Sequence, residues 1–192
     1  TTESYDPKGA KKVLEDAGWV DTDGDGIREK DGKKLVVNWL TYPTRQELPL
    51  LAESAQATLK EIGMDVEINN TLDVNEAVKD TSAWDVYAMA NVQAPTGDPE
   101  YWFRVFALSD SAKNQGKYSN AQLDALDEQL SQEFDTAKRA DLAVQMQQIL
   151  LDDNAFVFCS FLKMSMISRS NVSNYISHAC DYYQITADLD IE

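Results

Sequence analysis

Cysteine and histidine are scarce in this 192-residue sequence, which contains two Cys and one His. Cys159, Cys180 and His178 cannot supply the four ligands of a structural zinc site. A disulfide between the cysteines stays open, but buried free thiols are expected because unpaired cysteine behaves as a small apolar side chain. A Cys–His catalytic pair needs a third group to orient the imidazole, and neither a nucleophile elbow nor a glycine-rich phosphate loop occurs. The sequence therefore predicts a protein that is not an enzyme.

Positive charge is also scarce, with 17 Lys and Arg residues against 33 Asp and Glu residues and a formal net charge of -16. This balance argues against a nucleic-acid partner, which requires clustered Lys and Arg. No apolar run approaches the roughly 20 residues of a membrane-spanning helix. The sequence starts without Met or the segments of a signal peptide, so it is expected to be part of a larger protein. The composition, 43% apolar and 26% charged, is typical of a globular domain.

Hydrophobic patterns in the first half alternate between strand and helix. Asp6 is placed to cap a first helix, Pro7 suits its first position, and Gly18 suits a left-handed end. Three later segments have strand patterns, and the longer of two intervening helical segments ends at Gly63. This order predicts an α/β fold with a mixed, largely parallel sheet and flanking helices. The expected strands span 34–42, 64–69 and 84–92, and the expected helices span 48–62 and 73–80.

The second half is predicted to be helical before a final apolar segment. Ser119 and Gln122 match a capping box ahead of one helix, and Asp135 is placed to cap another. The apolar segment 155–167 is predicted to form one long or two short buried strands.

Two predicted loops are candidates for ligand binding, because ligands of open α/β sheets bind beyond the carboxyl ends of the strands. The loops 41–49 and 91–102 combine aromatic with polar side chains, a mixture suited to a small ligand. Two of their residues have an alternative role, since Asp98 also fits a helix cap and Arg45 also fits a solvated surface. The predicted ligand-contacting residues are Tyr42 and Arg45 in the first loop, and Gln93, Thr96, Asp98 and Tyr101 in the second.

The stretch "DTDGDGIREKDGK", residues 21–33, resembles the first half of a calcium-binding loop. Calcium takes six to eight oxygen ligands, and alternating Asp side chains around a Gly turn can converge on it. The twelfth position, where a bidentate Glu belongs, is Gly32, and a strand rather than a helix is expected to follow. An incomplete calcium loop and a metal-free polar turn both stay open. The candidate ligands are the side chains of Asp21, Asp23, Asp25 and Glu29 with the carbonyl of Ile27.

Seven segments in a fixed order span nearly the whole chain: "YDPKGAKKVLEDAGW", "DTDGDGIREKDGKKL", "LPLLAESAQATLKEIGMDVEI", "WDVYAMA", "GDPEYWF", "YSNAQLDALDEQL" and "RADLAVQMQQILLDDNAFVF". Together they resemble the family 5 extracellular solute-binding proteins, the peptide- and nickel-type binding components of ABC importers.

This resemblance implies one lobe of a two-lobed, periplasmic-binding-protein-like fold that closes around a solute by a hinge motion. Residues 4–168 correspond to an α/β solute-binding lobe, and residues 169–192 to a tail returning toward the other lobe. The implied protein is a non-enzymatic receptor outside the cytoplasmic membrane, either periplasmic or a cell-surface lipoprotein. Its partners would be ABC-transporter permease subunits and a peptide, nickel chelate or related solute. The acidic loop would be an accessory of the lobe, away from its cleft.

One departure from the family concerns the ligand. In dipeptide-binding members, an Asp that accepts the α-amino group of the peptide lies three residues before the Asp-Pro pair. Pro95 occupies that position here and supplies no carboxylate, which favours a metal chelate or a modified peptide. The alternative from another class of protein is a calcium-stabilised structural or adhesion module.

Overall fold

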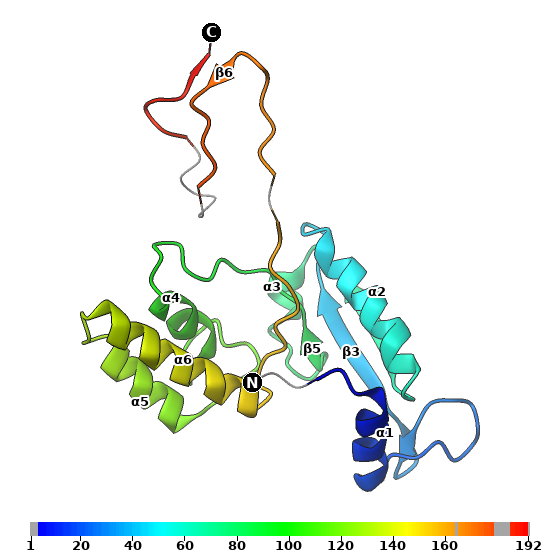
Figure 1. Ribbon diagram of the computed structural model, residues 1–192. Coiled ribbons are helices and arrows are strands. Elements are labelled where there is room, and N and C mark those ends of the chain that lie inside the picture. The colour runs from blue at the N-terminus through cyan, green and yellow to red at the C-terminus, as the bar shows by residue number, and fades with distance from the viewer. Residues whose placement is uncertain (1–3, 164, 179–184, 192) are drawn as a thin grey trace. The chain divides into compact units, whose positions relative to one another are not determined.

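The structure, a computed structural model, describes residues 4–163, 165–178 and 185–191 (Figure 1). The chain divides into two compact units, Thr1–Asn91 with Gln115–Lys117, and Val92–Asn114 with Tyr118–Glu192. This division falls inside the predicted lobe 4–168, and the predicted boundary at residue 168 stays a prediction. Within the part of the chain that the structure describes, no helix has the length and apolar character needed to cross a membrane.

A three-stranded parallel sheet forms the centre of the first unit. The strand β3 (Val36–Thr41) lies between β4 (Asp65–Asn70) and the short β5 (Val86–Tyr87). Val36 pairs with Asp65, and Trp39 pairs with both Ile68 and Val86. The predicted α/β class and parallel pairing are therefore confirmed, although β5 is much shorter than the predicted strand 84–92.

Helices connect these strands in the predicted order. The helix α2 (Glu47–Lys60) joins β3 to β4, lies beside β3 (Figure 1) and buries Leu48 and Ala52. The short α3 (Val74–Ala77) lies between β4 and β5. The first helix, α1 (Pro7–Asp16), is capped as predicted, because the Asp6 side chain accepts a hydrogen bond from the Gly9 amide at 2.9 Å. Gly18 and Gly63 have φ values of 88° and 87°, which suit glycine at these predicted helix ends.

A small hairpin holds the acidic loop against this unit. The strands β1 (Glu29–Lys30) and β2 (Lys33–Lys34) pair antiparallel, so Lys34 belongs to the hairpin rather than to the predicted strand 34–42. The buried Arg28 donates to the carbonyls of Ile62 and Trp19 at 2.8 and 2.9 Å. These bonds attach the hairpin to the ends of α1 and α2.

Helices of the second unit pack around an apolar core. They are α4 (Glu100–Trp102), the π-helix η1 (Phe103–Ala107), α5 (Ala121–Leu130) and α6 (Thr136–Asp152). Asp135 caps α6 as predicted and accepts from the Lys138 amide at 3.0 Å. The predicted Ser119–Gln122 capping box is wrong, because the Asn120 side chain accepts from the amides of Gln122 and Leu123. The buried core comprises Phe103, Ala107, Leu108, Leu123, Leu126, Leu130, Ala143, Met146 and Leu150.

The segment after α6 differs most from the prediction. The expected buried strands over 155–167 are wrong, because the described residues 155–163 and 165–167 form neither strand nor helix. Apart from its first residues, the segment is largely exposed, with Val157, Phe161 and Ile167 at 86%, 78% and 91%. Apolar composition signals a tendency to be buried, but a strand also needs a partner, and none of the described strands pairs with this segment. The later strands β6 (Val172–Ser173) and β7 (Asp190–Ile191) pair antiparallel with each other.

The cysteine prediction is corrected for one of the two thiols. Cys159 is free but exposed rather than buried, because it belongs to this extended segment. Cys180 lies outside the described residues.

Candidate functional site

The first predicted ligand loop begins where β3 ends. Tyr42 is half-buried, and its hydroxyl oxygen accepts a hydrogen bond from the Ala90 amide at 3.3 Å. Burial raises the pKa of Tyr87, and the neighbouring Tyr42 raises it further. Arg45 is exposed, and its backbone carbonyl accepts from the Leu48 amide at 3.1 Å. The loop therefore exposes the side chain of Arg45 to solvent, whereas the Tyr42 hydroxyl already has a hydrogen bond to the backbone after β5.

The second predicted loop follows β5 and leads into α4. Gln93 and Thr96 are exposed, and Tyr101 retains 42% of its exposure. The Gly97 amide donates to the Ala94 carbonyl at 3.0 Å, and Gly97 has a φ of 81° that favours glycine. This tight turn gives the loop a defined path ahead of α4.

Asp98 is held by the partly buried Arg139. Its Oδ1 accepts from the Glu100 amide at 2.9 Å, so it caps the start of α4 as the alternative role proposed. The Arg139 Nη2 also donates to both Asp98 oxygens at 2.8 Å, and Nε donates to Oδ2 at 3.1 Å. Burial by itself would raise the pKa of Asp98, but the hydrogen bonds from Arg139 and the Glu100 amide lower it overall. The Asp98 carboxylate thus has intramolecular partners on both oxygens.

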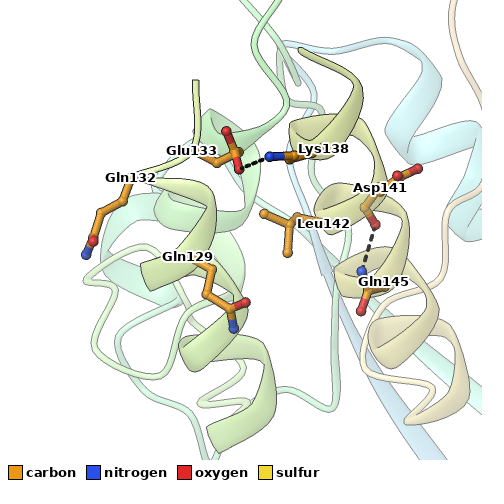
Figure 2. Close-up of a pocket in the computed structure, with 7 residues that line it drawn as sticks. All are labelled: Gln129, Gln132, Glu133, Lys138, Asp141, Leu142 and Gln145. Carbon is orange, nitrogen blue, oxygen red and sulfur yellow. Dashed lines mark hydrogen bonds and ion pairs between the residues drawn. The ribbon is translucent and has the colours of Figure 1, made fainter. Parts of the chain in front are cut away.

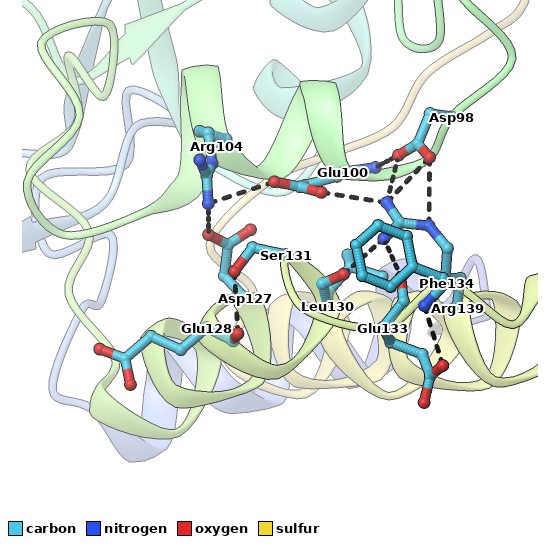
Figure 3. Close-up of polar contacts among 10 residues, drawn as sticks. All are labelled: Asp98, Glu100, Arg104, Asp127, Glu128, Leu130, Ser131, Glu133, Phe134 and Arg139. Carbon is cyan, nitrogen blue, oxygen red and sulfur yellow. Dashed lines mark hydrogen bonds and ion pairs between the residues drawn. The ribbon is translucent and has the colours of Figure 1, made fainter.

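The ion pairs continue from this arginine across the second unit (Figure 3). Arg139 Nη2 lies 3.0 Å from Glu100 Oε2, and Arg104 Nη2 lies 3.1 Å from Glu100 Oε1. Arg104 also lies 3.0 Å from Oδ2 of the buried Asp127. Burial raises the pKa of Asp127 in spite of the opposing effect of Arg104. The network links α4, η1, α5 and α6 through three carboxylates and two guanidinium groups.

The sequence pattern of α5 and α6 indicates that these charges are partly or fully buried. Arg139 shares a helical stripe with Ala143, Met146 and Leu150, and Asp127 lies four residues after Leu123, so each charge interrupts an otherwise buried face. A charge in such a stripe requires a partner, because burying it alone is costly. Which partner it finds is set by tertiary structure, since 41 residues separate Asp98 from Arg139.

Aromatic side chains cluster around Trp102, the residue after Tyr101. The Trp102 ring lies 5.1 Å from Phe156, 5.5 Å from Phe158 and 6.0 Å from Phe106. Trp102 and Phe106 are half-buried in the second unit. On α4, Tyr101 is therefore the exposed aromatic residue, at 42%, whereas Trp102 is half-buried.

The four carboxylates of the acidic loop do converge. Oxygens of Asp21, Asp23, Asp25 and Glu29 all lie within 4.8 Å of one another. Lys34 is placed among them, with Nζ 3.3 Å from Asp23 Oδ2, 3.6 Å from Glu29 Oε1, and in contact with Asp25. The hydrogen bond from Lys34 lowers the pKa of Asp25. The arrangement has the oxygen chemistry of a calcium site, while an ammonium group supplies the positive charge.

An open polar groove of about 520 Å³ lies between α5 and α6 (Figure 2). Lys138 and Glu133 form an ion pair of 3.7 Å at one end of it. None of the predicted ligand residues lines this groove. Its lining residues are Gln129, Gln132, Glu133, Lys138, Asp141, Leu142 and Gln145.

The predicted site residues are divided between the two units. Tyr42 and Arg45 belong to the first, whereas Gln93, Thr96, Asp98 and Tyr101 belong to the second. The structure brings the last four together on one continuous loop and helix start. That the two loops lie side by side in a common cleft stays a prediction.

Known proteins resemble the chain in sequence and in fold. Residues 1–114 match the bacterial extracellular solute-binding proteins, family 5 Middle. The nickel-binding protein NikA of Staphylococcus aureus is 27% identical over 174 residues, which are 88% of this chain and 34% of that protein. The oligopeptide-binding protein AppA of Bacillus subtilis is 29% identical over 178 residues, which are 91% of this chain and 32% of that protein. A crystal structure of a nickel ABC transporter from Bacillus halodurans has a TM-score of 0.73 and 26% identity, covering 100% of this chain and 40% of that chain.

These matches confirm the resemblance drawn from the seven segments and give no support to the alternative of a calcium-stabilised structural or adhesion module. The chain spans about a third of the length of the two curated relatives. Because the match to the family extends over more than half of its residues, the chain belongs to the bacterial extracellular solute-binding proteins, family 5.

Proposed function

We propose that this chain is the solute-binding lobe of a receptor that serves an ABC importer outside the cytoplasmic membrane. Family membership supports the class of protein. The parallel sheet supports the position of the site, because both candidate loops follow the carboxyl ends of strands. The observation that carries the proposal is the loop 91–99, which exposes Gln93 and Thr96 while side-chain hydrogen bonds hold its two ends.

The proposed solute is a peptide or a nickel chelate, with permease subunits of the importer as the protein partners. The names of the nickel-binding and oligopeptide-binding relatives support this class. Pro95, in place of the carboxylate that dipeptide-binding members carry, favours the chelate or a modified peptide over an ordinary dipeptide. A location in the periplasm, or on the cell surface as a lipoprotein, is part of the same proposal.

Calorimetric titration of the complete receptor tests this function. The probes are Ni(II) with excess L-histidine, whose imidazole suits nickel, and an unmodified dipeptide. We expect a micromolar or tighter dissociation constant for the nickel complex and weaker binding of the dipeptide. Failure of both probes to bind at millimolar concentration would contradict the proposed class.

Two substitutions test the assigned surface in the same receptor. Gln93→Ala and Tyr101→Ala should each weaken binding of the nickel complex by about tenfold, equivalent to roughly 1.4 kcal/mol, with an unchanged melting temperature. The matched control is Gln147→Ala, at an exposed position of α6 outside both loops. Equal affinities of the Gln93 and Gln147 variants would remove Gln93 from the site. A large fall in melting temperature of the Tyr101 variant would place Tyr101 in the core.

We further propose that calcium binds the acidic loop as an accessory ion that stabilises the lobe. The residues fit this ion, because four carboxylates converge within 4.8 Å and the Ile27 carbonyl lies in the same loop. The hydrogen bonds inside the loop support an accessory role rather than a requirement. Asp21 accepts from the amides of Gly24 and Gly26 at 2.8 and 3.0 Å, which already defines the turn.

We also propose that the segment after α6 and the tail 169–192 lead toward the other lobe of the receptor. The exposure of Val157, Phe161 and Ile167 supports this, because so many large apolar side chains are seldom left in water. Deuterium exchange in the complete receptor should be slower over 157–167 than in this chain alone. Equal exchange in both proteins would contradict the proposed contact.

A further inference from the structure

Side chains hold both ends of the loop that carries Gln93 and Thr96. At its amino end, the Ala90 amide donates to the Tyr42 hydroxyl at 3.3 Å, a long hydrogen bond. At its carboxyl end, Arg139 donates to both oxygens of Asp98 at 2.8 Å. Charge-assisted bonds to two oxygens are stronger and more directional than one long neutral bond. The carboxyl end is therefore the better-fixed end of the loop.

Arg139 is itself fixed by the body of the second unit. Its side chain is 15% exposed, and Nη1 donates to the carbonyl of Glu133 at 2.7 Å and also to that of Leu130 (Figure 3). Both carbonyls lie where α5 ends and before α6 begins. One guanidinium group thus connects the α5–α6 turn to Asp98 and, through Glu100, to the first turn of α4.

The chemistry of this contact requires an arginine. Five N–H donors in a planar fork can serve two carboxylates and two carbonyls at once, whereas the ammonium group of lysine has three donors and no such plane. Arg104 offers a comparison in the same network, because it contacts Glu100 and Asp127 but not Asp98. Loss of Arg104 should therefore remove ion pairs of the unit without removing the hydrogen bonds to Asp98.

We propose that Arg139 is a positioning residue for solute binding, which acts by fixing Asp98 and thereby the loop from Gln93 to Tyr101. The proposal rests on the proposed function, since the loop is the assigned solute surface. Asp98 then serves as the anchor of the loop rather than as a direct ligand of the solute. Preorganisation of this kind strengthens binding, because a loop that is already ordered loses less conformational entropy when the solute binds.

Hydrogen–deuterium exchange of the chain tests the anchoring step without any ligand. Arg139→Gln should accelerate exchange of the amides in 92–99, whereas Arg104→Gln should leave these amides close to the parent. Arg139→Lys should give an intermediate rate, because it retains the charge but loses the fork. Parent-like exchange over 92–99 in Arg139→Gln, or equal acceleration in Arg104→Gln, would overturn the proposal.

Affinity for Ni(II) with excess L-histidine in the complete receptor tests the positioning step. Arg139→Gln should weaken binding by about tenfold and Arg104→Gln by less than about twofold, when both are compared at similar melting temperatures. Asp98→Asn combined with Arg139→Gln should be no weaker than either single variant, because both remove the same anchor. A further loss of affinity in the double variant would indicate that Asp98 contacts the solute directly, and would overturn its assignment as the anchor of the loop. If the parent receptor binds neither probe, the proposed function fails while the exchange experiment still decides the anchoring.

Discussion

At the scale of single residues, Asp127 is a buried carboxylic acid with only one of its oxygens in an ion pair. Its side chain is 4% exposed, and among the described residues no hydrogen-bond partner reaches its Oδ1. Arg104 pairs with the other oxygen but is itself 54% exposed, so water weakens that attraction. Burial therefore outweighs the ion pair, and the pKa of Asp127 rises above its ordinary value.

The direction of this shift gives a pH-dependent prediction. A carboxyl whose pKa is raised in the folded state favours the neutral form, so its ionisation costs stability as the pH rises above the unfolded value of about 3.9. We expect the free energy of unfolding of the parent to fall relative to that of Asp127→Asn as the pH rises above about 3.9. Urea unfolding at several pH values measures it. The matched control is Glu128→Gln, at the next and exposed position of α5, and the same trend in both variants would contradict the assignment.

At the scale of elements, the acidic loop is a turn completed by its own hydrogen bonds and by Lys34. The Ile27 amide donates to Asp25 at 2.9 Å, and Lys34 contacts Asp25 and lies 3.3 Å from Asp23. A calcium ion would have to displace this ammonium group. The loop should therefore fold without calcium and gain stability with it.

Calcium should raise the melting temperature of the chain at millimolar concentration. The expected stabilisation is about 2.7 kcal/mol at a hundredfold excess over the dissociation constant. Asp23→Ala should abolish the shift, whereas Lys34→Met should enlarge it because the competing cation is gone. Magnesium is the control ion, since it demands a smaller and stricter octahedral site. A parent protein that shows no calcium-dependent shift would leave the loop as a metal-free polar turn.

Helix ends that depend on hydrogen bonds between residues close in sequence were mostly predicted correctly. A strand depends on pairing with a distant segment, and the predicted strands over 155–167 were wrong. Asp6 and Asp135 cap the predicted helices because a capping side chain bonds amides only three residues away. The helix α5 is capped by Asn120 and not by the adjacent Ser119 as predicted. Both residue types suit a helix cap, so residue type alone does not distinguish the two positions. The segment 155–167 has the composition of a strand, but its pairing partner is not encoded within the segment.

The candidate site shows the same division. The two candidate loops were predicted from strand order, because the carboxyl ends of parallel strands lie at the same edge of a sheet. The contact between Arg139 and Asp98 spans 41 residues, which no local pattern specifies. Strand order therefore predicts the two candidate loops, and the solute site there stays a prediction, whereas the contact that holds Asp98 was not predicted.

At the scale of the whole molecule, the chain spans about a third of the length of its curated relatives. Sites for small ligands bury roughly 70–90% of the ligand surface, which a single lobe of a two-lobed receptor cannot achieve. The remaining contacts must overcome the same loss of translational and rotational freedom with less buried surface. Affinity should therefore fall steeply when the lobe is studied alone.

We predict negligible binding of Ni(II) with excess L-histidine, or of a dipeptide, to the 192-residue chain under conditions in which the complete receptor binds. Losing half of a binding free energy of about 8.2 kcal/mol, which corresponds to a micromolar constant, changes that constant to about millimolar. Calorimetric titration of both proteins in the same buffer measures the difference, and a cooperative thermal transition of the chain confirms that it is folded. A micromolar constant for the chain alone would mean that one lobe contains the whole site. Closure of a second lobe would then contribute to transport rather than to affinity.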